Sequence, residues 1–291
     1  MTSTLDPQTA PDVTPAQRVD AWLADFEAAL AVRDIDRVAG MFAVDSFWRD
    51  LVSFTWNLKT MEGREQITDM LTTRLAGTDP SGFRTRETPT EDGGVTTAFI
   101  EFETAVGRGV GHLRLKDEDG QPRAWTLLTA LQELKGHEEP KGPSRVLGAV
   151  HGDDPDPRSW AEKRAEEQAE LGRSIQPYAL VIGGGQGGIA LGARLRQLGV
   201  PAIVVDKHER PGDQWRKRYK SLCLHDPVWY DHLPYLPFPA NWPVFAPKDK
   251  IGDWLEFYTR VMEVPYRSKT TCTSASFDEE TNRWTVEVDR D

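Results

Sequence analysis

The sequence predicts two domains of different fold class. An α+β domain, in which helices precede an antiparallel sheet curved into a cone, is expected over residues 1–135, and an α/β domain over residues 177–291. Apolar residues recur at helical spacing in the first third of the chain and then alternate as in strands. Residues 178–207 instead combine a strand, a glycine loop, a helix and a second strand, which is typical of a parallel sheet.

Helices are predicted at the start of the first domain. Thr14-Pro15-Ala16-Gln17 combines an N-cap, a proline at the first helical position and a capping-box glutamine. The apolar residues of this helix are Val19, Trp22, Leu23, Phe26 and Leu30. A short second helix is expected over residues 34–42 and a third after Gly63.

Alternating apolar residues after Gly82 predict a sheet. A first strand is expected earlier, over residues 47–56. The later strands are expected over residues 83–87, 95–102, 108–115 and 124–134. Asp119-Gly120 is a hairpin signal between the last two strands.

Helices followed by a curved antiparallel sheet resemble the cone-shaped fold of the nuclear transport factor 2 and SnoaL-like group. This fold often holds a pocket between sheet and helices, which Trp48, Asp50, Trp56 and His112 could line. An Asp and a His there could do acid–base chemistry on a polyketide-like substrate. The alternative is that the aromatic residues are core and that the sheet serves dimerisation or docking. Burial tendencies favour this alternative, and a fold alone does not establish chemistry.

Residues 136–176 are expected to link the two domains. Residues 136–158 are rich in proline, glycine and charge, and should be extended and exposed. Ser159-Trp160-Ala161-Glu162 is a capping box that predicts a surface helix running to Leu171, with Gly172 as its stop. Trp160 and Leu171 are the expected anchors of this helix.

A glycine motif opens the second domain. The strand Leu180-Val181-Ile182 is followed by Gly183-x-Gly185-x-x-Gly188. Gly183 allows a tight turn, Gly185 lets a pyrophosphate approach the backbone, and Gly188 lets helix and strand pack closely. Free N–H groups at the helix start favour an anion. The predicted phosphate loop is Gly183, Gly185, Gln186, Gly187 and Gly188.

The second strand of this motif, Ile203-Val204-Val205, ends at Asp206. A carboxylate at this place would accept hydrogen bonds from ribose hydroxyls, and it would repel a phosphate on the same ribose. Lys207 follows directly and is expected beside the same site. The complete arrangement favours a Rossmann-type dinucleotide site over an ordinary turn. The motif does not distinguish FAD from NAD, because both contain adenosine diphosphate.

The residues after Asp206 resemble the flavin-containing monooxygenases, and most closely the bacterial and plant members of the indole-pyruvate monooxygenase type. Gly212-Asp213-Gln214-Trp215-Arg216 is similar to the family's Gly-Gly-x-Trp-Arg turn, with Asp213 in place of the second glycine. Tyr219-Lys220-Ser221-Leu222 and Leu236-Pro237-Phe238-Pro239 follow at the family's spacing. Later matches include Trp242-Pro243, Lys248, Trp254-Leu255, Tyr258 and Trp284-Thr285-Val286. The resemblance covers about residues 178–291 and implies that the chain is the N-terminal part of such an enzyme.

This resemblance implies FAD as the cofactor and NADPH as the reductant of the intact family member. It places the turn at residues 212–216 beside the ribityl and pyrophosphate part of FAD. The residues that it adds to the cofactor site are Gly212, Gln214, Trp215, Arg216 and Leu222. His225 is the catalytic candidate, because plant-type members carry His there, near the reactive flavin carbon, and an imidazole could donate a hydrogen bond to flavin or its peroxide. The alternative for His225 is a structural role. Core positions are favoured for Trp229, Tyr230, Tyr235 and Phe238.

The family's chemistry is the insertion of one oxygen atom from O2 into a small organic substrate. The second glycine fingerprint, which would bind NADPH, and the returning segment of the flavin domain do not occur before Asp291. This chain by itself is therefore expected to be catalytically incomplete. Two other interpretations stay open: a NAD-dependent oxidoreductase with a single nucleotide fold, and a non-catalytic dinucleotide-binding remnant.

Composition limits the other functions. A net charge of −11 argues against a nucleic-acid or anionic-membrane surface. Two cysteines are too few for a disulfide scaffold or a zinc site, so no metal site is expected. The N-terminus lacks a basic segment followed by an apolar one, and no run approaches a membrane span, which predicts a cytoplasmic protein. A small-molecule substrate is the expected partner, and a homodimer through the first domain is the candidate assembly.

Overall fold

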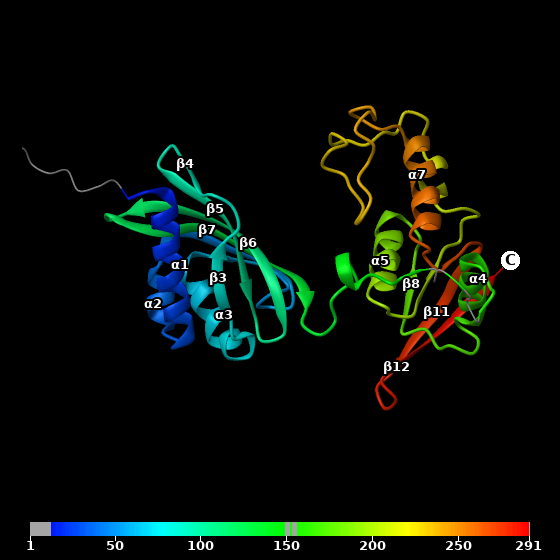
Figure 1. Cartoon of the computed structure of the whole chain (residues 1–291), viewed down its shortest axis with the longest axis horizontal. Helices are drawn as coiled ribbons and strands as arrows, with labels where there is room; N and C mark the ends of the chain where they lie inside the picture. The colour runs from blue at the N-terminus through cyan, green and yellow to red at the C-terminus, as the bar shows by residue number, and fades with distance from the viewer. Residues whose placement is uncertain (1–12, 149–151, 153–155, 291) are drawn as a thin grey trace, which may run out of the picture. The chain divides into compact units, whose positions relative to one another are not determined.

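The computed structural model describes residues 13–148, 152 and 156–290. The chain divides into two compact units, Met1–Glu138 and Glu139–Asp291 (Figure 1). The boundary falls inside the segment predicted to be a linker. Residues 1–12, where no targeting signal is predicted, residues 149–151 and 153–155 of the predicted linker, and Asp291 lie outside the described residues.

The first unit packs three helices on one face of an antiparallel sheet with one parallel pair (Figure 1). The sheet order is β2-β1-β7-β6-β5-β3, with β4 also paired to β5, and β1 runs parallel to β7. The helices are α1 (Pro15–Ala31), α2 (Ile35–Gly40) and α3 (Gly63–Thr78). The strands are β1 (Phe42–Leu51), β2 (Leu58–Glu62), β3 (Ser81–Thr85), β4 (Thr90–Asp92), β5 (Val95–Glu103), β6 (Gly107–Glu118) and β7 (Gln121–Leu134).

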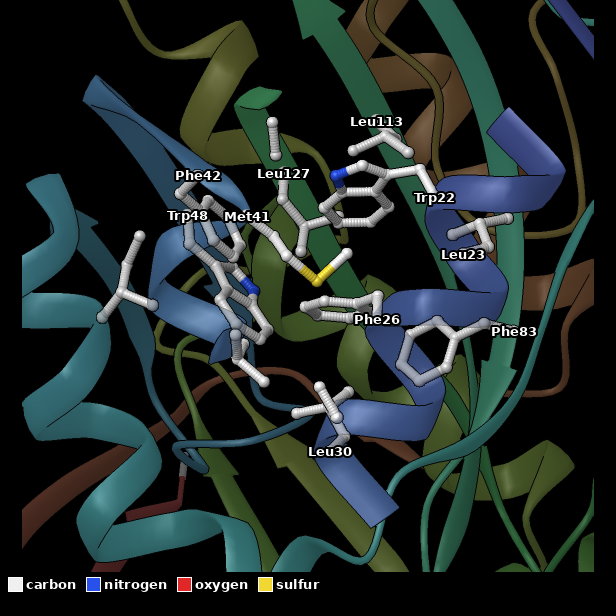
Figure 2. Close-up of a cluster of buried hydrophobic side chains, with 14 of the residues drawn as sticks. Trp22, Leu23, Phe26, Leu30, Met41, Phe42, Trp48, Phe83, Leu113 and Leu127 are labelled. Atoms are coloured by element: carbon white, nitrogen blue, oxygen red, sulfur yellow. The ribbon is translucent and has the colours of Figure 1, made fainter. Parts of the chain in front are cut away.

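Helix α1 begins where the capping box predicts. The Gln17 N–H donates to Thr14 Oγ1 at 3.2 Å, and the Thr14 N–H donates back to Gln17 Oε1 at 3.0 Å. The apolar side of α1 then fills the core with aromatic rings. The Trp22 and Phe26 rings stack with centroids 4.7 Å apart, and Phe42 and Trp48 stack at 5.5 Å (Figure 2). The predicted apolar face of α1 is therefore confirmed.

The predicted strand over residues 47–56 is wrong at both ends. Strand β1 begins at Phe42 and stops at Leu51, where the buried Asp50 carboxylate accepts the main-chain N–H groups of Ser53, Phe54 and Thr55. These bonds turn the chain, and β2 then returns beside β1. Neither β2 nor β4 was expected from the sequence, because both strands are short.

We expect the first unit to fold by itself. Its core residues all come from within residues 19–127, so no apolar contact from the second unit is needed. Residues 1–138 expressed alone should give a soluble fragment with a cooperative thermal transition, followed by circular dichroism. A fragment that melts without cooperativity would show that the second unit stabilises the first.

The second unit contains a small parallel sheet of order β10-β9-β8. Strand β8 (Ala179–Ile182) leads through α5 (Gln186–Gln197) to β9 (Ala202–Val205). A long connection with α6 (Asp213–Arg216) and α7 (Lys248–Val261) then reaches β10 (Tyr266–Arg267). A hairpin of β11 (Thr270–Asp278) and β12 (Arg283–Arg290) follows. Helices α5 and α7 enclose the core against β9, with Ile189, Ala193, Val204, Ile251, Leu255 and Tyr258.

The predicted linker is exposed at nearly all of its described residues, as its composition predicts. After the turn η1 (Gly142–Ser144), the capping box at Ser159 starts α4 (Trp160–Glu170) as predicted. Leu171 is buried and confirmed as an anchor, whereas Trp160 is half exposed and attaches through its Nε1, which donates to Glu263 at 2.6 Å. Glu139 differs from this prediction: its side chain is 9% exposed, accepts a hydrogen bond from Tyr235 and forms an ion pair with Arg194.

Large aromatic residues in the long connection between β9 and β10 are more exposed than expected. Trp229, Tyr230 and Tyr235 are exposed, so the prediction of core positions is wrong for them. Phe238 is partly buried and stacks on Trp242 with centroids 4.8 Å apart. In the part of the chain that the structure describes, no helix has both the length and the apolar character needed to cross a bilayer.

Candidate nucleotide-binding site

The glycine loop between β8 and α5 has the geometry that close backbone packing requires. Gly183 lies at φ +101°, which strains any other residue, and its N–H donates to the Val205 oxygen at 2.9 Å. A Cβ on Gly188 would come closer than 3.0 Å to the main-chain oxygen of Gly183. The start of α5 therefore crosses the end of β8 at a separation that only glycine allows.

A second close contact lies one turn further along α5 and was missed from the sequence. A Cβ on Gly192 would meet Val204 Cγ2 at 2.6 Å and Val264 Cγ1 at 2.7 Å. Gly192 is thus the position at which α5 approaches β9. Its spacing of one helical turn from Gly188 is the sequence signal that could have found it.

The N-terminus of α5 is open to a ligand. Gly185 is its N-cap and supplies no side-chain hydrogen bond, so the first-turn N–H groups lack a cap. Among the described residues, only Gln214 Nε2 lies within 4 Å of the Cβ position on Gly185, at 3.7 Å, and Gly187 has no neighbour there. Uncapped N–H groups at the positive end of a helix dipole are suited to a phosphate.

Asp206 lies beside this loop, as predicted. Its side chain is buried, and each carboxylate oxygen accepts one main-chain N–H at 2.7 Å, Oδ2 from Gly184 and Oδ1 from His208. Each oxygen keeps a lone pair that could accept a hydroxyl. Asp206 therefore fixes the glycine loop and still presents an acceptor at the end of β9.

Tyr266 on β10 covers the same loop and was not expected. Its hydroxyl lies 3.4 Å from the Gly184 oxygen, and its ring occupies the space where a side chain on Gly184 would be. Burial, followed by the charges of Asp206 and Asp213, raises the pKa of Tyr266 well above its usual value. The phenol therefore stays protonated and can donate a hydrogen bond at neutral pH.

Gln214 is the most unusual residue of the site. Both its amide nitrogen and its amide oxygen are buried without a hydrogen-bond partner among the described residues, next to Gly185. Unpaired buried amides are rare, because losing the hydrogen bonds to water costs about 1–3 kcal/mol per group. A polar ligand over the glycine loop would restore these bonds.

The turn that carries Gln214 is held against α7 and the loop. Gly212 has φ +87°, and a Cβ there would come closer than 3.0 Å to the main chain of Gly252. Trp215 Nε1 donates to Gln186 Oε1 at 3.1 Å, so two residues of the predicted site contact each other directly.

Arg216 is engaged by protein acceptors. Its guanidinium donates to Asp213 at 3.1 Å, Asp253 at 2.9 Å and Glu256 at 2.7 Å. Asp213, which stands where the resembling family has glycine, is buried in this cluster. Arg216 therefore acts here by fixing the turn to α7, and this geometry does not aim it at a phosphate.

The remaining predicted residues of the site lie at its margin. Leu222 is buried and its oxygen accepts the Lys248 N–H at 2.9 Å, which keeps this segment beside α7. The side chains of Lys207 and His225 are exposed. Neither is brought into the group formed by Gly185, Gln186, Asp206, Gln214 and Trp215.

The polar candidates of the first unit do not form a site. Asp50 faces Thr129 on β7, and His112 faces Leu128, the neighbouring position on the same strand, so the two side chains lie on opposite faces of the sheet. Trp48 is core, which confirms the alternative for this residue, whereas Trp56 is 59% exposed. Burial, followed by the charge of Arg114, lowers the pKa of His112.

Comparisons with known proteins give relatives that match part of the chain. No family model matches. The chain is 35% identical over 128 residues to indole-3-pyruvate monooxygenase YUCCA1 of Oryza sativa subsp. japonica, covering 44% of this chain and 31% of that protein. It is 38% identical over 101 residues to an uncharacterized CzcO-like oxidoreductase of Geobacillus kaustophilus, covering 35% and 29%. The chain thus spans about a third of the length of these relatives.

Two solved structures are each similar to part of the chain. A flavin-containing monooxygenase from Stenotrophomonas maltophilia has 27% identity and a TM-score of 0.35, covering 38% of this chain and 33% of that chain. An NTF2-like protein with a cystatin-like fold from Novosphingobium aromaticivorans has 14% identity and a TM-score of 0.32, covering 40% and 81%.

Proposed function

We propose that the second unit binds FAD and forms the adenosine-binding part of a flavin-dependent monooxygenase that uses NADPH and acts on a small organic substrate. The observation that carries the proposal is the unpartnered Gln214 amide beside the uncapped start of α5. The partial similarity to an indole-3-pyruvate monooxygenase and to a CzcO-like oxidoreductase supports this class of reaction.

The residues of the glycine loop fit the adenosine diphosphate half of FAD. The first-turn N–H groups after Gly185 would bind the pyrophosphate, and Asp206 would accept a ribose hydroxyl. Gln214, at the edge of the loop, would donate through its amide nitrogen to a pyrophosphate or ribityl oxygen and accept a ribityl hydroxyl at its amide oxygen. FAD, when bound, supplies the redox chemistry by which such enzymes transfer one oxygen atom of O2.

The other predicted residues have supporting roles in this proposal. Trp215 and Arg216 would hold the turn that carries Gln214, through Gln186 and α7 respectively. Tyr266 would close the loop from the side of β10. His225, which is exposed here, remains a proposed flavin contact on the basis of the family resemblance.

A NAD-dependent oxidoreductase is the competing function, and binding measurements separate the two. The purified full chain should bind FAD, seen as quenching of flavin fluorescence, and should bind NAD more weakly in calorimetry. Preference for NAD over FAD would overturn the proposal. Failure to bind either would overturn the proposal and would also contradict a non-catalytic dinucleotide-binding remnant.

Replacing Asp206 with alanine should weaken FAD binding by about 1–3 kcal/mol, the usual loss for a hydrogen bond to a charged group. Asp206 also accepts the N–H groups of Gly184 and His208, so its loss could destabilise the loop as well as weaken binding. The thermal midpoint of each variant is therefore compared with that of the unmodified protein. Glu209→Ala, a change at an exposed carboxylate three residues away, is the matched control. A flavin titration in which Asp206→Ala binds as tightly as Glu209→Ala would refute the ribose assignment.

For the first unit we propose a cone of the NTF2 or SnoaL-like kind that can pair with a second copy. Phe47 and Phe99 lie on the sheet face opposite the helices and are 41% and 48% exposed. The centroids of the Phe99 and His112 rings lie 4.9 Å apart. Exposed aromatic rings on a sheet face are a common basis of dimerisation.

We keep the cytoplasmic location and the absence of a nucleic-acid partner as proposals from charge and composition.

A further inference from the structure

A groove on the first unit lies between α1 and the hairpin that joins β6 to β7. Its volume is about 770 Å³, and it is lined by Val13, by one side of α1 from Gln17 to Asp25, by Met41 and by residues of the hairpin from Asp117 to Arg123. This volume falls in the range of small-molecule sites. None of the four polar or aromatic candidates of the first unit lines it.

Two arginines that line this groove have a buried Nε–H group without a hydrogen-bond partner among the described residues. They are Arg18 and Arg123, and each Nε is a donor. Trp22 also lines the groove, but it is only 4% exposed and its ring points from α1 into the core cluster (Figure 2). Because buried donors without acceptors are costly, two at one groove indicate a missing acceptor.

The carboxylates at the groove do not supply that acceptor. Asp117 pairs with Nη2 of Arg18 at 2.5 Å, and Asp25 pairs with Arg37 on α2. Arg123 donates through Nη1 to the Gly40 oxygen, which leaves its Nε unsatisfied. The groove therefore offers spare donors, while its acidic side chains already have partners.

The walls between these donors are largely apolar. Ala21 and Ala24 of α1 face the groove together with Met41 and Pro122. A multiply charged anion such as phosphate would meet Asp25 and Asp117 and would find no use for these walls. A single carboxylate on an apolar body matches both the donors and the walls.

We propose that this groove binds a small organic carboxylate, with its carboxylate at the guanidinium groups of Arg18 and Arg123 and its apolar body against α1 and Met41. The site lies wholly in the first unit and does not depend on the flavin proposal. It gives the first unit a ligand-binding function of its own.

Calorimetry on the full chain with phenylacetate as the probe tests the proposal. We expect saturable binding with a dissociation constant of about 1 mM or lower. Phenylacetamide has the same ring but no charge, and its dissociation constant should be higher by a factor of roughly five or more. Inorganic phosphate should not compete with phenylacetate. Absence of phenylacetate binding, or equal binding of the amide, would overturn the proposal.

Two tryptophan substitutions on the same helix locate the binding. Ala21→Trp places a bulky side chain in the groove, whereas Ala28→Trp makes the same change at another exposed position of α1 that does not line it. Ala21→Trp should weaken phenylacetate binding at least tenfold, and Ala28→Trp should leave it unchanged. Equal affinities in two variants with normal melting would place the ligand elsewhere and refute the groove as its site.

The donors are tested separately. Arg18→Gln removes the guanidinium while keeping a polar side chain of similar reach, and it should weaken phenylacetate binding roughly tenfold with little effect on phenylacetamide. A parallel loss for both compounds would contradict a carboxylate held by Arg18.

Discussion

Replacing Gly188 with alanine should destabilise the second unit by about 3 kcal/mol or more and abolish retention of FAD. The added Cβ would come closer than 3.0 Å to the main-chain oxygen of Gly183, and no side-chain rotation can relieve a contact between two backbones. The start of α5 would have to move away from β8, which would also displace the N–H groups proposed to bind the pyrophosphate.

The neighbouring glycine provides a matched control. A Cβ on Gly187 meets no atom within 4 Å, so Gly187→Ala should be neutral or slightly stabilising in the first turn of the helix. Urea unfolding of both variants, together with flavin titration, separates the two effects. If Gly188→Ala were as stable as Gly187→Ala and bound FAD equally well, the close crossing of β8 and α5 would be wrong.

Replacing Asp50 with alanine should destabilise the first unit by about 3–5 kcal/mol, because several buried donors would each lose a partner at about 1–3 kcal/mol. The carboxylate is fully buried and accepts Thr55 N–H at 2.8 Å, Thr55 Oγ1 at 2.7 Å and Thr129 Oγ1 at 2.8 Å. Thr129 Oγ1 in turn accepts Trp48 Nε1 at 2.9 Å. Loss of the carboxylate would therefore disturb both the turn after β1 and the aromatic core.

An exposed aspartate on the same strand serves as the control. Asp45 pairs with Lys116 at the surface, and the pKa of its carboxyl is lowered mainly by the hydrogen bond from that lysine. Asp45→Ala should shift the denaturation midpoint far less than Asp50→Ala, since surface ion pairs contribute little. Chemical denaturation followed by tryptophan fluorescence compares the two. Similar midpoints would mean that Asp50 does not hold the turn, and would reopen the case for an ionisable group in a ligand pocket.

Features that depend on local interactions were predictable from the sequence. The capping boxes at Thr14 and Ser159 start helices where expected, since donor and acceptor lie three residues apart. The hairpin at Asp119-Gly120 also forms as predicted, with both residues at positive φ. The strand, glycine loop and helix around Gly183 follow the same rule, because each step is set by neighbouring residues.

Contacts between distant strands could not be predicted from the sequence. Whether Asp50 and His112 share a face depends on the register of β1 and β6 on β7, and one residue of offset places the two side chains on opposite sides of the sheet. The sequence suggested an acid–base pair, and the register separates its members. The burial of Asp50 by a turn five residues long likewise depends on Thr129 from another strand.

The sequence by itself determined the two fold classes, the glycine loop and the acidic residue at the end of β9, because these depend on short-range pattern and on glycine's lack of a side chain. Only the tertiary structure decided which donors are left without partners. Gln214 lies over the loop because Gly212 crosses Gly252, forty residues away in the chain. Arg18 and Arg123, each with a buried Nε that lacks a partner among the described residues, line one groove because α1 packs beside the β6–β7 hairpin. Hydrogen-bond satisfaction depends on all the neighbours of a group, and those neighbours are known only when the chain is folded.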